Sequence, residues 1–440
     1  MTPGAQVAAA IEILAAIESG ASAADDIAAD YFRRRRYIGA KDRARIAGHV
    51  YTVLRHRASL DWWIARLGRG HVEIDARSRV LAGLVLVEAW QPEMVIKCCD
   101  GDRFRPAPAS EAETRLVCGL ETRTLRHPQM PRAVANDLPE WLEPYFDRAF
   151  GQGLEREMAA LNATAPIDLR VNLIKRDREA VRRALAAEGV KAEPTPLSPV
   201  GLRLAERAPL SGLTAFKEGL FDVQDEGSQL AAVIVDAKPG MRVVDFCAGA
   251  GGKTLALAAA MRNKGKLVAC DVSPRRLERA ARRLRRAGVA NVERRVLARE
   301  HDPWVKHHAH SFDRVFVDAP CLGTGTWRRN PDAKWRAQPQ DLAELVEHQQ
   351  QILRSAARLV RPGGRLIYAT CSLLHEEDEA QAEAFLAVEP DFTAVPAARA
   401  WHDTIGSPCP CGADHLFLTP ARHGTDGFFV AIFERSQTAT

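Results

Sequence analysis

Four short apolar runs in the second half of the chain constrain its fold more than any other feature. They span Met241–Phe246, Lys266–Cys270, Arg314–Val317 and Arg365–Ala369. Helical patterns separate each run from the next, and this alternation is typical of a parallel α/β sheet. We therefore expect an α/β domain that presents the ends of these strands at one edge of the sheet, where such folds bind ligands.

Other domains are expected before this one, because 440 residues exceed what one hydrophobic core normally serves. Apolar residues from Val7 to Leu14 recur at i, i+4 and i+7, which is helical spacing. Further helices are expected over Ala44–Leu67 and Val80–Ile96, and strand signals are scarce. The pattern predicts an all-helical domain over residues 1–145.

A small mixed domain is expected over residues 146–222. Leu169–Leu173 alternates like a strand, Arg178–Gly189 is helical, and proline-rich connections follow. The predicted fold class is thus multidomain, with an all-α domain, a small α+β domain and a C-terminal α/β domain over residues 223–436.

The composition predicts a soluble cytoplasmic protein. Hydrophobic residues make up 46% and charged residues 27%, and no apolar run approaches the roughly 20 residues that cross a bilayer. Residues 1–17 lack the basic flank and apolar centre of a signal peptide. Nine cysteines spread over a long chain suit a reducing compartment. We expect no membrane partner and a monomer.

Positive charge is clustered, although the net charge is only +5. Clusters of this kind fit a polyanion such as nucleic acid, and the alternative is a solvated helix face. The clusters are Arg33–Arg36, the arginines at 275, 276, 279, 282, 283, 285 and 286, and Arg328–Arg329.

A glycine-dense turn follows the first apolar run of the α/β domain, and a helix follows the turn. Glycines let a ligand approach the backbone, and the helix N-terminus offers free N–H donors. The turn is not a G-x-G-x-x-G motif, because Thr254 stands at the third glycine, and it is not a P-loop, because Cys247 stands at the first. Asp271 closes the next run at the distance of a ribose-binding carboxylate, and Ser273 can cap the helix after it. Adenosine binding is predicted, with a purely structural turn as the alternative.

Two cysteines follow neighbouring apolar runs near the same expected edge. Asp318-Ala319-Pro320-Cys321 ends one run, and Thr370-Cys371-Ser372 ends the next. A lone buried cysteine is usually inert packing, but two at adjacent strand ends, with an acid beside one, indicate chemistry. Spacing alone does not decide which thiol attacks.

These motifs resemble those of the Sun-type family of RNA cytosine-5 methyltransferases, over nearly the whole chain. Asp245–Thr254 is similar to the family's cofactor loop, Asp318–Cys321 to its fourth motif and Thr370–Ser372 to its sixth. Gln224-Asp225 and Ser228 resemble the segment that leads into the catalytic domain.

The resemblance implies an S-adenosyl-L-methionine-dependent methylation of cytosine C5 in RNA, with 16S ribosomal RNA as the substrate. Cys371 would be the nucleophile that adds to C6, Cys321 would assist release, and Asp318 would stabilise charge at N3, with Lys253 beside them. The cofactor contacts implied are Cys247, Ala248, Gly249, Ala250, Gly251, Gly252, Lys253, Asp271, Arg276 and Asp318.

The resemblance also implies a fold for each domain. The helical domain would be NusB-like and bind RNA, and the α/β domain would be Rossmann-like. Arg170–Asn172 resembles the family's small domain, and Arg328–Trp335 resembles its substrate-facing segment.

Two segments differ from what the family motifs or a metal site would require. Val296–Arg299 lacks the acidic residue that the family places near adenine, and Glu300 would substitute only if the loop shifts. Cys409 and Cys411, with histidines nearby, are too close for a structural zinc pair, so a surface turn and no metal are expected.

Three alternatives differ from this function. A catalytically silent RNA-binding assembly factor is disfavoured by the presence of Asp318, Cys321 and Cys371, whereas another RNA substrate such as tRNA stays open. A nicotinamide-dependent oxidoreductase is disfavoured by the glycine pattern.

Overall fold

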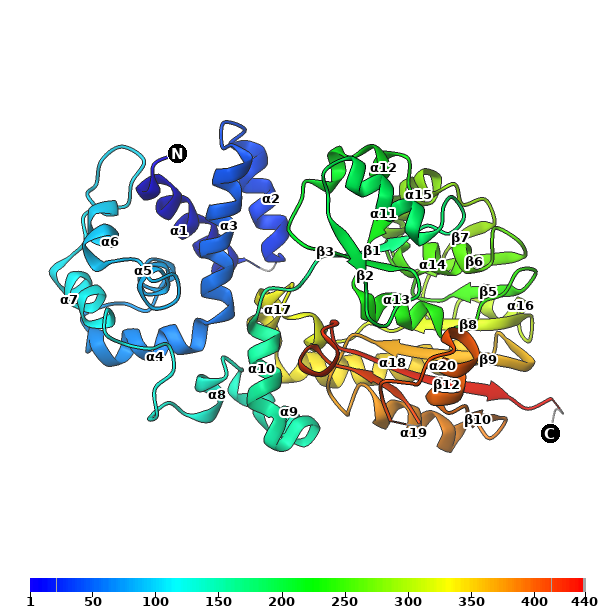
Figure 1. Cartoon of the computed structure of the whole chain (residues 1–440). Coiled ribbons are helices and arrows are strands. Elements are labelled where there is room, and N and C mark those ends of the chain that lie inside the picture. The colour runs from blue at the N-terminus through cyan, green and yellow to red at the C-terminus, as the bar shows by residue number, and fades with distance from the viewer. Residues whose placement is uncertain (21, 413, 438–440) are drawn as a thin grey trace. The chain divides into compact units, whose positions relative to one another are not determined.

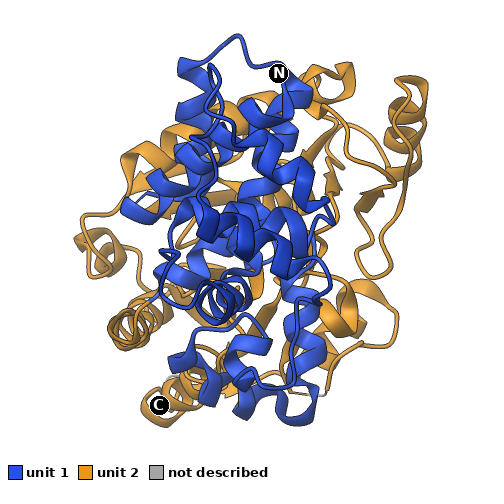
Figure 2. Ribbon diagram, turned by 90° about the vertical axis from the view of Figure 1, so that its left-hand side faces the viewer, with its two compact units in different colours: residues 1–164, 327–337 blue, residues 165–326, 338–440 orange. Residues whose placement is uncertain are grey.

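The computed structural model describes residues 1–20, 22–412 and 414–437, and it divides into two compact units (Figures 1 and 2). One unit comprises Met1–Thr164 and Trp327–Ala337, and the other comprises Ala165–Thr326 and Gln338–Thr440. None of the helices in the described part of the chain is long and apolar enough to cross a membrane.

Every regular element described in the first unit is a helix, which confirms the expected all-helical region. The α-helices are α1 Pro3–Ser19, α2 Ala24–Arg34, α3 Ala40–Arg55, α4 Arg57–Gly68, α5 Ala76–Leu86, α6 Pro92–Cys98, α7 Glu111–Leu120, α8 Arg132–Ala135, α9 Glu143–Phe150, α10 Leu154–Asn162 and α17 Pro331–Arg336, and the 3-10 turns are η1 Glu140–Leu142 and η2 Gly151–Gly153. Two single helices expected from the sequence are each two helices. His56 separates α3 from α4, and α5 ends at Leu86 before α6 begins at Pro92, where proline has no N–H to continue a helix.

The first unit extends beyond residue 145, where the sequence pattern placed its end. Phe146 on α9 is fully buried and stacks on Trp327, with ring centroids 5.2 Å apart. Lys334 on α17 donates to the Arg55 carbonyl at 3.2 Å and to Asn162 Oδ1 at 2.8 Å. The segment 327–337, which contains the Arg328–Trp335 stretch that the resemblance assigned to the substrate, is therefore packed against the helical core.

The second unit begins with a small domain around a four-stranded antiparallel sheet in the order β2-β3-β1-β4. Its elements are β1 Asp168–Val171, α11 Arg178–Ala187, β2 Ala192–Pro194, β3 Gly201–Leu204, η3 Leu210–Gly212, α12 Thr214–Lys217 and β4 Phe221–Val223. The expected strand and helix are confirmed, and Val181 and Leu185 of α11 are buried against this sheet.

The rest of this unit is an α/β domain around an eight-stranded sheet. The order is β10-β12-β9-β8-β5-β6-β7, with β11 also paired to β12. The strands are β5 Arg242–Asp245, β6 Lys266–Asp271, β7 Val292–Val296, β8 Phe312–Asp318, β9 Val360–Thr370, β10 Phe392–Ala394, β11 Leu416–Leu418 and β12 Phe428–Arg435. The helices are α13 Glu226–Val233, α14 Gly252–Ala260, α15 Pro274–Ala287, α16 Pro303–His307, α18 Pro339–Ala357, α19 Glu379–Val388, α20 Ala397–Ile405 and α21 Pro420–His423, with the 3-10 turn η4 Thr324–Thr326.

The four expected strands are confirmed, but the sheet is mixed instead of purely parallel. Strands β7, β6, β5, β8 and β9 run parallel, whereas β12 pairs antiparallel with β9. Residues Phe428–Phe433 of β12 are apolar on both faces of the strand, and pairing with β9 inside the sheet buries both faces.

Alternating side chains of the strands face two helical layers. Val244 and Val268 pack with α16, α18 and α19 on one face of the sheet. Val243 and Leu267 pack with α13, α14 and α20 on the other. This period-2 pattern fixes the register, so the loops after β5, β6, β8 and β9 all leave from one edge.

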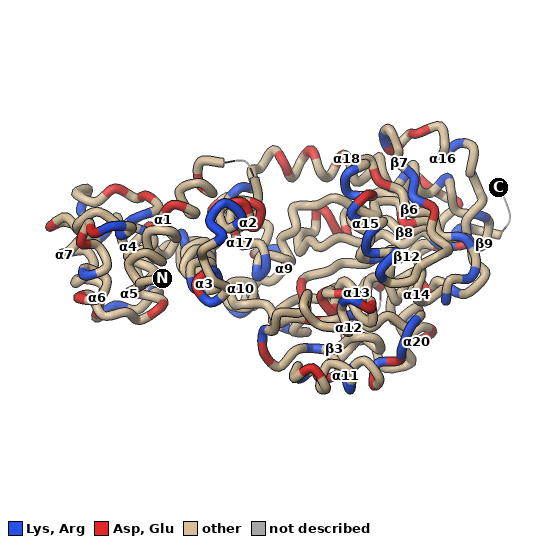
Figure 3. Tube along the Cα trace, turned by 90° about the horizontal axis from the view of Figure 1, so that it is seen from above, with Lys and Arg blue, Asp and Glu red and all other residues tan. Residues whose placement is uncertain are grey.

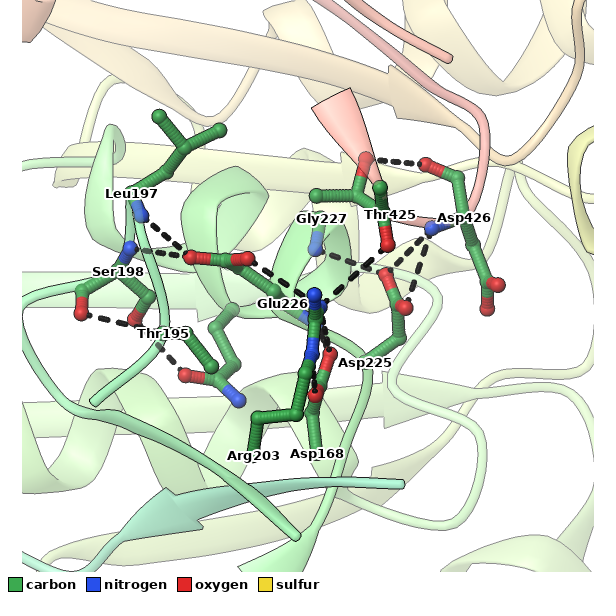
Figure 4. A network of polar contacts seen from close by, with 12 residues as sticks. Asp168, Thr195, Leu197, Ser198, Arg203, Asp225, Glu226, Gly227, Thr425 and Asp426 are labelled. Atoms are coloured by element: carbon green, nitrogen blue, oxygen red, sulfur yellow. Dashed lines mark hydrogen bonds and ion pairs between the residues drawn. The ribbon is translucent and has the colours of Figure 1, made fainter. Parts of the chain in front are cut away.

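A buried polar network joins the small domain to the α/β domain (Figure 4). Arg203 on β3 donates to both oxygens of Asp168, at 2.7 and 2.9 Å, and contacts Glu226 Oε2 at 3.4 Å. Glu226 Oε1 accepts from Leu197 and Ser198 backbone N–H groups at 2.6 and 2.7 Å. The residue before Glu226, Asp225, accepts from the backbone N–H of Asp426, in the loop before β12. The small domain is thus fixed to the α/β domain within one compact unit.

Candidate active site

The turn after β5 adopts a conformation that requires glycine. Gly249 and Gly251 have φ of 54° and 80°, in the left-handed region, and a Cβ on Gly251 would lie 2.8 Å from the Ala280 Cβ. Thr254 on α14 donates to Asp245 Oδ2 at 2.6 Å. Burial raises the pKa of Asp245 to about 7. The turn is therefore held between the end of β5 and the first turn of α14.

Asp271 at the end of β6 fixes the same turn from the other side. Its carboxylate accepts from the Gly249 N–H at 2.8 Å and from the Ser273 N–H at 2.7 Å. Ser273 caps α15, as expected from the sequence, by accepting from the Arg276 N–H at 3.3 Å. One carboxylate thus orders two loops, and it lines the cavity beside them.

A cavity of about 460 Å³ lies at this edge of the sheet. It brings together the expected cofactor residues Cys247, Ala248, Gly249, Ala250, Gly252, Lys253, Asp271, Arg276 and Asp318. Gly251 does not line it, because this glycine supports the turn by its contact with α15. Glu300 does line it, so an acid is present despite the missing one at Val296–Arg299.

Several lining residues were missed by the sequence reasoning. Phe246, Val272, Leu297 and Ile352 provide apolar walls, and Gln224, Ser228, Arg283, Pro320 and His348 provide polar or turn positions. Gln224 and Ser228 belong to the segment that resembles the family's entry to its catalytic domain. They lie about twenty residues or more before the glycine turn, so the sequence gave no sign that they reach this cavity. The mixture suits S-adenosyl-L-methionine: carboxylates for ribose hydroxyls, apolar walls for adenine, and a glycine turn that leaves room for the ligand.

Lys253 and Asp318, both half-buried, form an ion pair that lines the cavity. Lys253 Nζ lies 2.7 Å from Asp318 Oδ2 and 5.0 Å from the centre of the Phe428 ring. Burial acts to lower the pKa of Lys253, but the charge and hydrogen bond of Asp318 outweigh it, so the pKa is raised. Lys253 stays cationic and can hold a charged group beside the sheet.

The two thiols meet, although fifty residues separate them. Cys321 Sγ lies 3.5 Å from Cys371 Sγ. The hydrogen bond to Cys371 and burial both raise the pKa of Cys321 well above its usual value, and the negative charges of Cys371 and Glu377 add to this. Cys321 therefore stays a protonated thiol, and it contacts Cys371 directly.

Three buried polar residues next to the thiols were missed by the sequence reasoning: Gln349 on α18, and Glu377 and Asp378 just before α19. The acidic run Glu376–Glu379 that follows the Cys371 motif was the available signal. A run of charges usually marks a solvated face, so its burial could not be expected.

The C-terminal cysteines do not form a ligand cluster in the part of the chain that the structure describes. Cys411 donates to the Phe417 carbonyl at 3.0 Å and lies 3.7 Å from His423 Nε2. Burial raises the pKa of Cys411 to about 11. Within the described residues, no three potential ligands gather here.

The arginines of α15 differ in their surroundings, and Figure 3 shows the charge along this helix. Arg283 and Arg286 pair with Asp222, at 2.8 and 3.1 Å, and so brace the small domain. Arg276 lines the cavity, and Arg275, Arg279, Arg282 and Arg285 are exposed. Part of the cluster is therefore structural.

Comparison with known proteins gives matches over most of the chain. Residues 232–434 match the family model described as 16S rRNA methyltransferase RsmB/F, and residues 138–211 match a ferredoxin-like domain of RsmF/B-like methyltransferases. A probable ribosomal RNA small subunit methyltransferase B of Synechocystis is 30% identical, covering 93% of this chain and 95% of the relative. A ribosomal RNA small subunit methyltransferase B of Xylella fastidiosa is 34% identical, covering 89% and 91%. A methyltransferase homologue from Pyrococcus horikoshii, solved as a crystal structure, is 28% identical with a TM-score of 0.59, covering 69% of this chain and 97% of the other.

Proposed function

Because the chain belongs to the 16S rRNA methyltransferase RsmB/F family, we propose that it methylates C5 of a cytosine in 16S ribosomal RNA. The observation that carries this proposal is the 3.5 Å approach of the Cys321 and Cys371 sulfurs beside the Lys253–Asp318 pair. Cytosine C5 is a poor nucleophile until a group adds to C6, and a thiolate is suited to that addition.

The methyl donor of the family is S-adenosyl-L-methionine, and when bound it supplies an electrophilic methyl group. The turn residues Cys247–Lys253 would hold it, with Asp271 on the ribose hydroxyls and Glu300 near the base. Arg276 at the cavity wall adds a donor for polar groups of the ligand. The apolar walls at Leu297 and Ile352 exclude water around the adenine.

In the proposed reaction Cys371 Sγ forms a bond to C6 of the cytosine, and the displaced electron pair makes C5 nucleophilic. In this proposal Asp318, paired with Lys253 at 2.7 Å, would stabilise the charge that develops at N3 during this addition. Once Cys371 is a neutral thioether, its charge no longer raises the pKa of Cys321, so that thiol ionises more easily. After C5 has taken the methyl group, Cys321 gives its own proton to solvent and accepts the C5 proton. The C5–H electron pair forms the C5–C6 double bond, the C6–S bond breaks, and Cys371 leaves as a thiolate.

The two cysteines are distinguished by covalent capture of RNA. Cys371→Ala should abolish both methylation and the adduct, whereas Cys321→Ala should accumulate a denaturant-resistant protein–RNA complex. Cys118→Ala, at an exposed cysteine of the helical unit, is the control and should behave as the unmodified protein. The opposite pattern for Cys321 and Cys371 would reverse their roles.

The substrate is identified by bisulfite mapping of total RNA from cells with and without the protein. One 5-methylcytosine lost from 16S ribosomal RNA is the expected result, and a loss confined to tRNA would replace the proposed substrate. RNA binding with no lost methylation anywhere would instead favour the silent assembly factor.

For the helical unit we propose a NusB-like fold that contacts RNA. Exposed arginines at 33, 34 and 36 support this, because sequence-independent affinity for RNA comes mainly from phosphate contacts. Affinity that does not fall between low and moderate salt would contradict it. We also propose that the protein is cytoplasmic, because the proposed substrate is cytoplasmic. We propose in addition that it acts as a monomer.

A further inference from the structure

Two consecutive acids, Glu377 and Asp378, lie buried beside the thiol pair and have no role in the reaction described above. Both are completely buried, which acidic residues almost never are unless they are paired. No lysine or arginine of the described chain forms an ion pair with either of them, and Glu377 Oε2 and Asp378 Oδ2 find no hydrogen-bond partner there. Burying an acid with an unpaired oxygen lowers the free energy of unfolding, so two neighbouring acids of this kind indicate a role beyond stability.

Glu377 holds the loop that carries Cys321. Its Oε1 accepts from the Leu322 N–H at 3.0 Å and from Gln349 Nε2 at 3.1 Å. The same Gln349 Nε2 donates to the Pro320 carbonyl at 2.9 Å. The backbone is therefore tied on both sides of Cys321, once directly and once through Gln349.

Asp378 holds the segment that carries Cys371. Its Oδ1 accepts from the Thr370 hydroxyl, and that hydroxyl oxygen accepts from the Ser372 N–H at 3.2 Å. The residues before and after Cys371 are thus tied to this one carboxyl group. The Tyr368 hydroxyl adds a bond of 2.6 Å to the backbone carbonyl of Glu377, which fixes the dipeptide to β9.

We propose that Glu377 and Asp378 are positioning residues that set the separation of the Cys321 and Cys371 sulfurs. Adjacent Cα atoms are about 3.8 Å apart across a trans peptide, so one dipeptide links the two thiol loops with almost no freedom. The consequence for catalysis rests on the proposed function, because a misplacement of about 1 Å at reacting groups can cost about 100-fold in rate.

The shifted pKa values of the two acids are consistent with this role. Burial raises the pKa of Glu377, and it raises the pKa of Asp378 well above its usual value. The charged neighbours that raise these pKa values include Glu376, Glu379 and Cys371, and His375 lies 3.4 Å from Glu379. A raised pKa favours the neutral form of a carboxyl group, which can hold these loops with less negative charge beside the two thiols.

The test measures thiol separation without any RNA. Diamide takes two electrons and two protons from a pair of nearby thiols and becomes the hydrazine, while the thiols form a disulfide. The rate of Cys321–Cys371 disulfide formation is followed by mass spectrometry in the full chain. We expect Glu377→Ala and Asp378→Ala to slow it by about tenfold or more, because disulfide formation demands close and oriented thiols.

The isosteric variants are the matched controls. Glu377→Gln and Asp378→Asn keep the accepting oxygen and imitate the protonated acid, so they should keep both the disulfide rate and the methylation rate within about threefold. The alanine variants should lose about 100-fold in kcat while S-adenosyl-L-methionine affinity, measured by calorimetry, stays within about threefold.

Three results would overturn the proposal: an unchanged disulfide rate in the alanine variants, an equal loss in the isosteric variants, or a parallel loss of cofactor binding that marks general unfolding. If an alanine variant does not fold, Gln349→Ala replaces it, because this change removes the hydrogen bonds of Gln349 to Pro320 and to Glu377. An unchanged disulfide rate in Gln349→Ala would also overturn the proposal. A chain that shows the expected disulfide rates but no RNA methylation would refute the proposed function and leave the positioning role intact.

Discussion

Gly325 is the position where one methyl group should disturb the site most. It lies in η4, its N–H donates to the Cys371 carbonyl at 2.9 Å, and its carbonyl accepts from the Gly427 N–H at 2.9 Å. A Cβ on Gly325 would lie 2.5 Å from the Gly427 carbonyl oxygen and 2.6 Å from its Cα. Gly325→Ala therefore forces two backbone segments apart.

The size of the effect follows from these distances. Ordinary van der Waals contact of a Cβ begins near 3.4 Å, so the two segments must separate by nearly 1 Å. Overpacking of this kind costs about 1–3 kcal/mol of stability. Because Gly325 holds the Cys371 backbone, we also expect a fall in methylation rate of about 100-fold, the order expected for a 1 Å misplacement.

The assay combines urea unfolding with methylation kinetics. Gly212→Ala is the control in the same unit, because a Cβ there meets no atom within 4 Å, and it should change stability by less than about 1 kcal/mol. If Gly325→Ala unfolds at the same urea concentration as the unmodified protein and methylates RNA at the same rate, the reasoning from the close Gly325–Gly427 approach is refuted.

Three further changes have defined outcomes. Asp271→Ala removes the acceptor of two backbone N–H groups at the cofactor turn, so calorimetry should show S-adenosyl-L-methionine affinity reduced by about tenfold or more, and unchanged affinity would exclude the contact. The pKa of Asp245 is raised from 3.8 to about 7, so between these pH values the folded state binds a proton that the unfolded state has lost, and the free energy of unfolding falls as pH rises. Asp245→Asn has no such proton, so its free energy of unfolding in urea should rise by about 3 kcal/mol relative to that of the unmodified protein between pH 5 and 8. A difference between the two proteins that is the same at both pH values would contradict this. Arg203→Met leaves the buried carboxylates of Asp168 and Glu226 without their cation and should cost about 3–5 kcal/mol, a loss that thermal unfolding would detect.

Much of the local structure could be predicted from the residues alone. The four apolar runs are strands, Ser273 caps the helix after Asp271, and the glycine turn connects β5 to α14. These features depend on neighbours in the sequence, such as side-chain period, capping chemistry and the positive φ that glycine tolerates. The first compact unit runs to Thr164, past the boundary expected at residue 145, and this extent depends on distant contacts such as that of Phe146 with Trp327.

The sequence determined that two thiols, an acid and a glycine turn would follow strand ends, because parallel strands place their ends at one edge of a sheet. Only the tertiary structure brought the sulfurs of Cys321 and Cys371 to 3.5 Å and made Cys321 the protonated thiol. It also buried the acids Glu377 and Asp378, which the sequence pattern would leave in solvent. The physical reason is that distance, burial and protonation depend on residues that are far apart along the chain, and only packing brings them together.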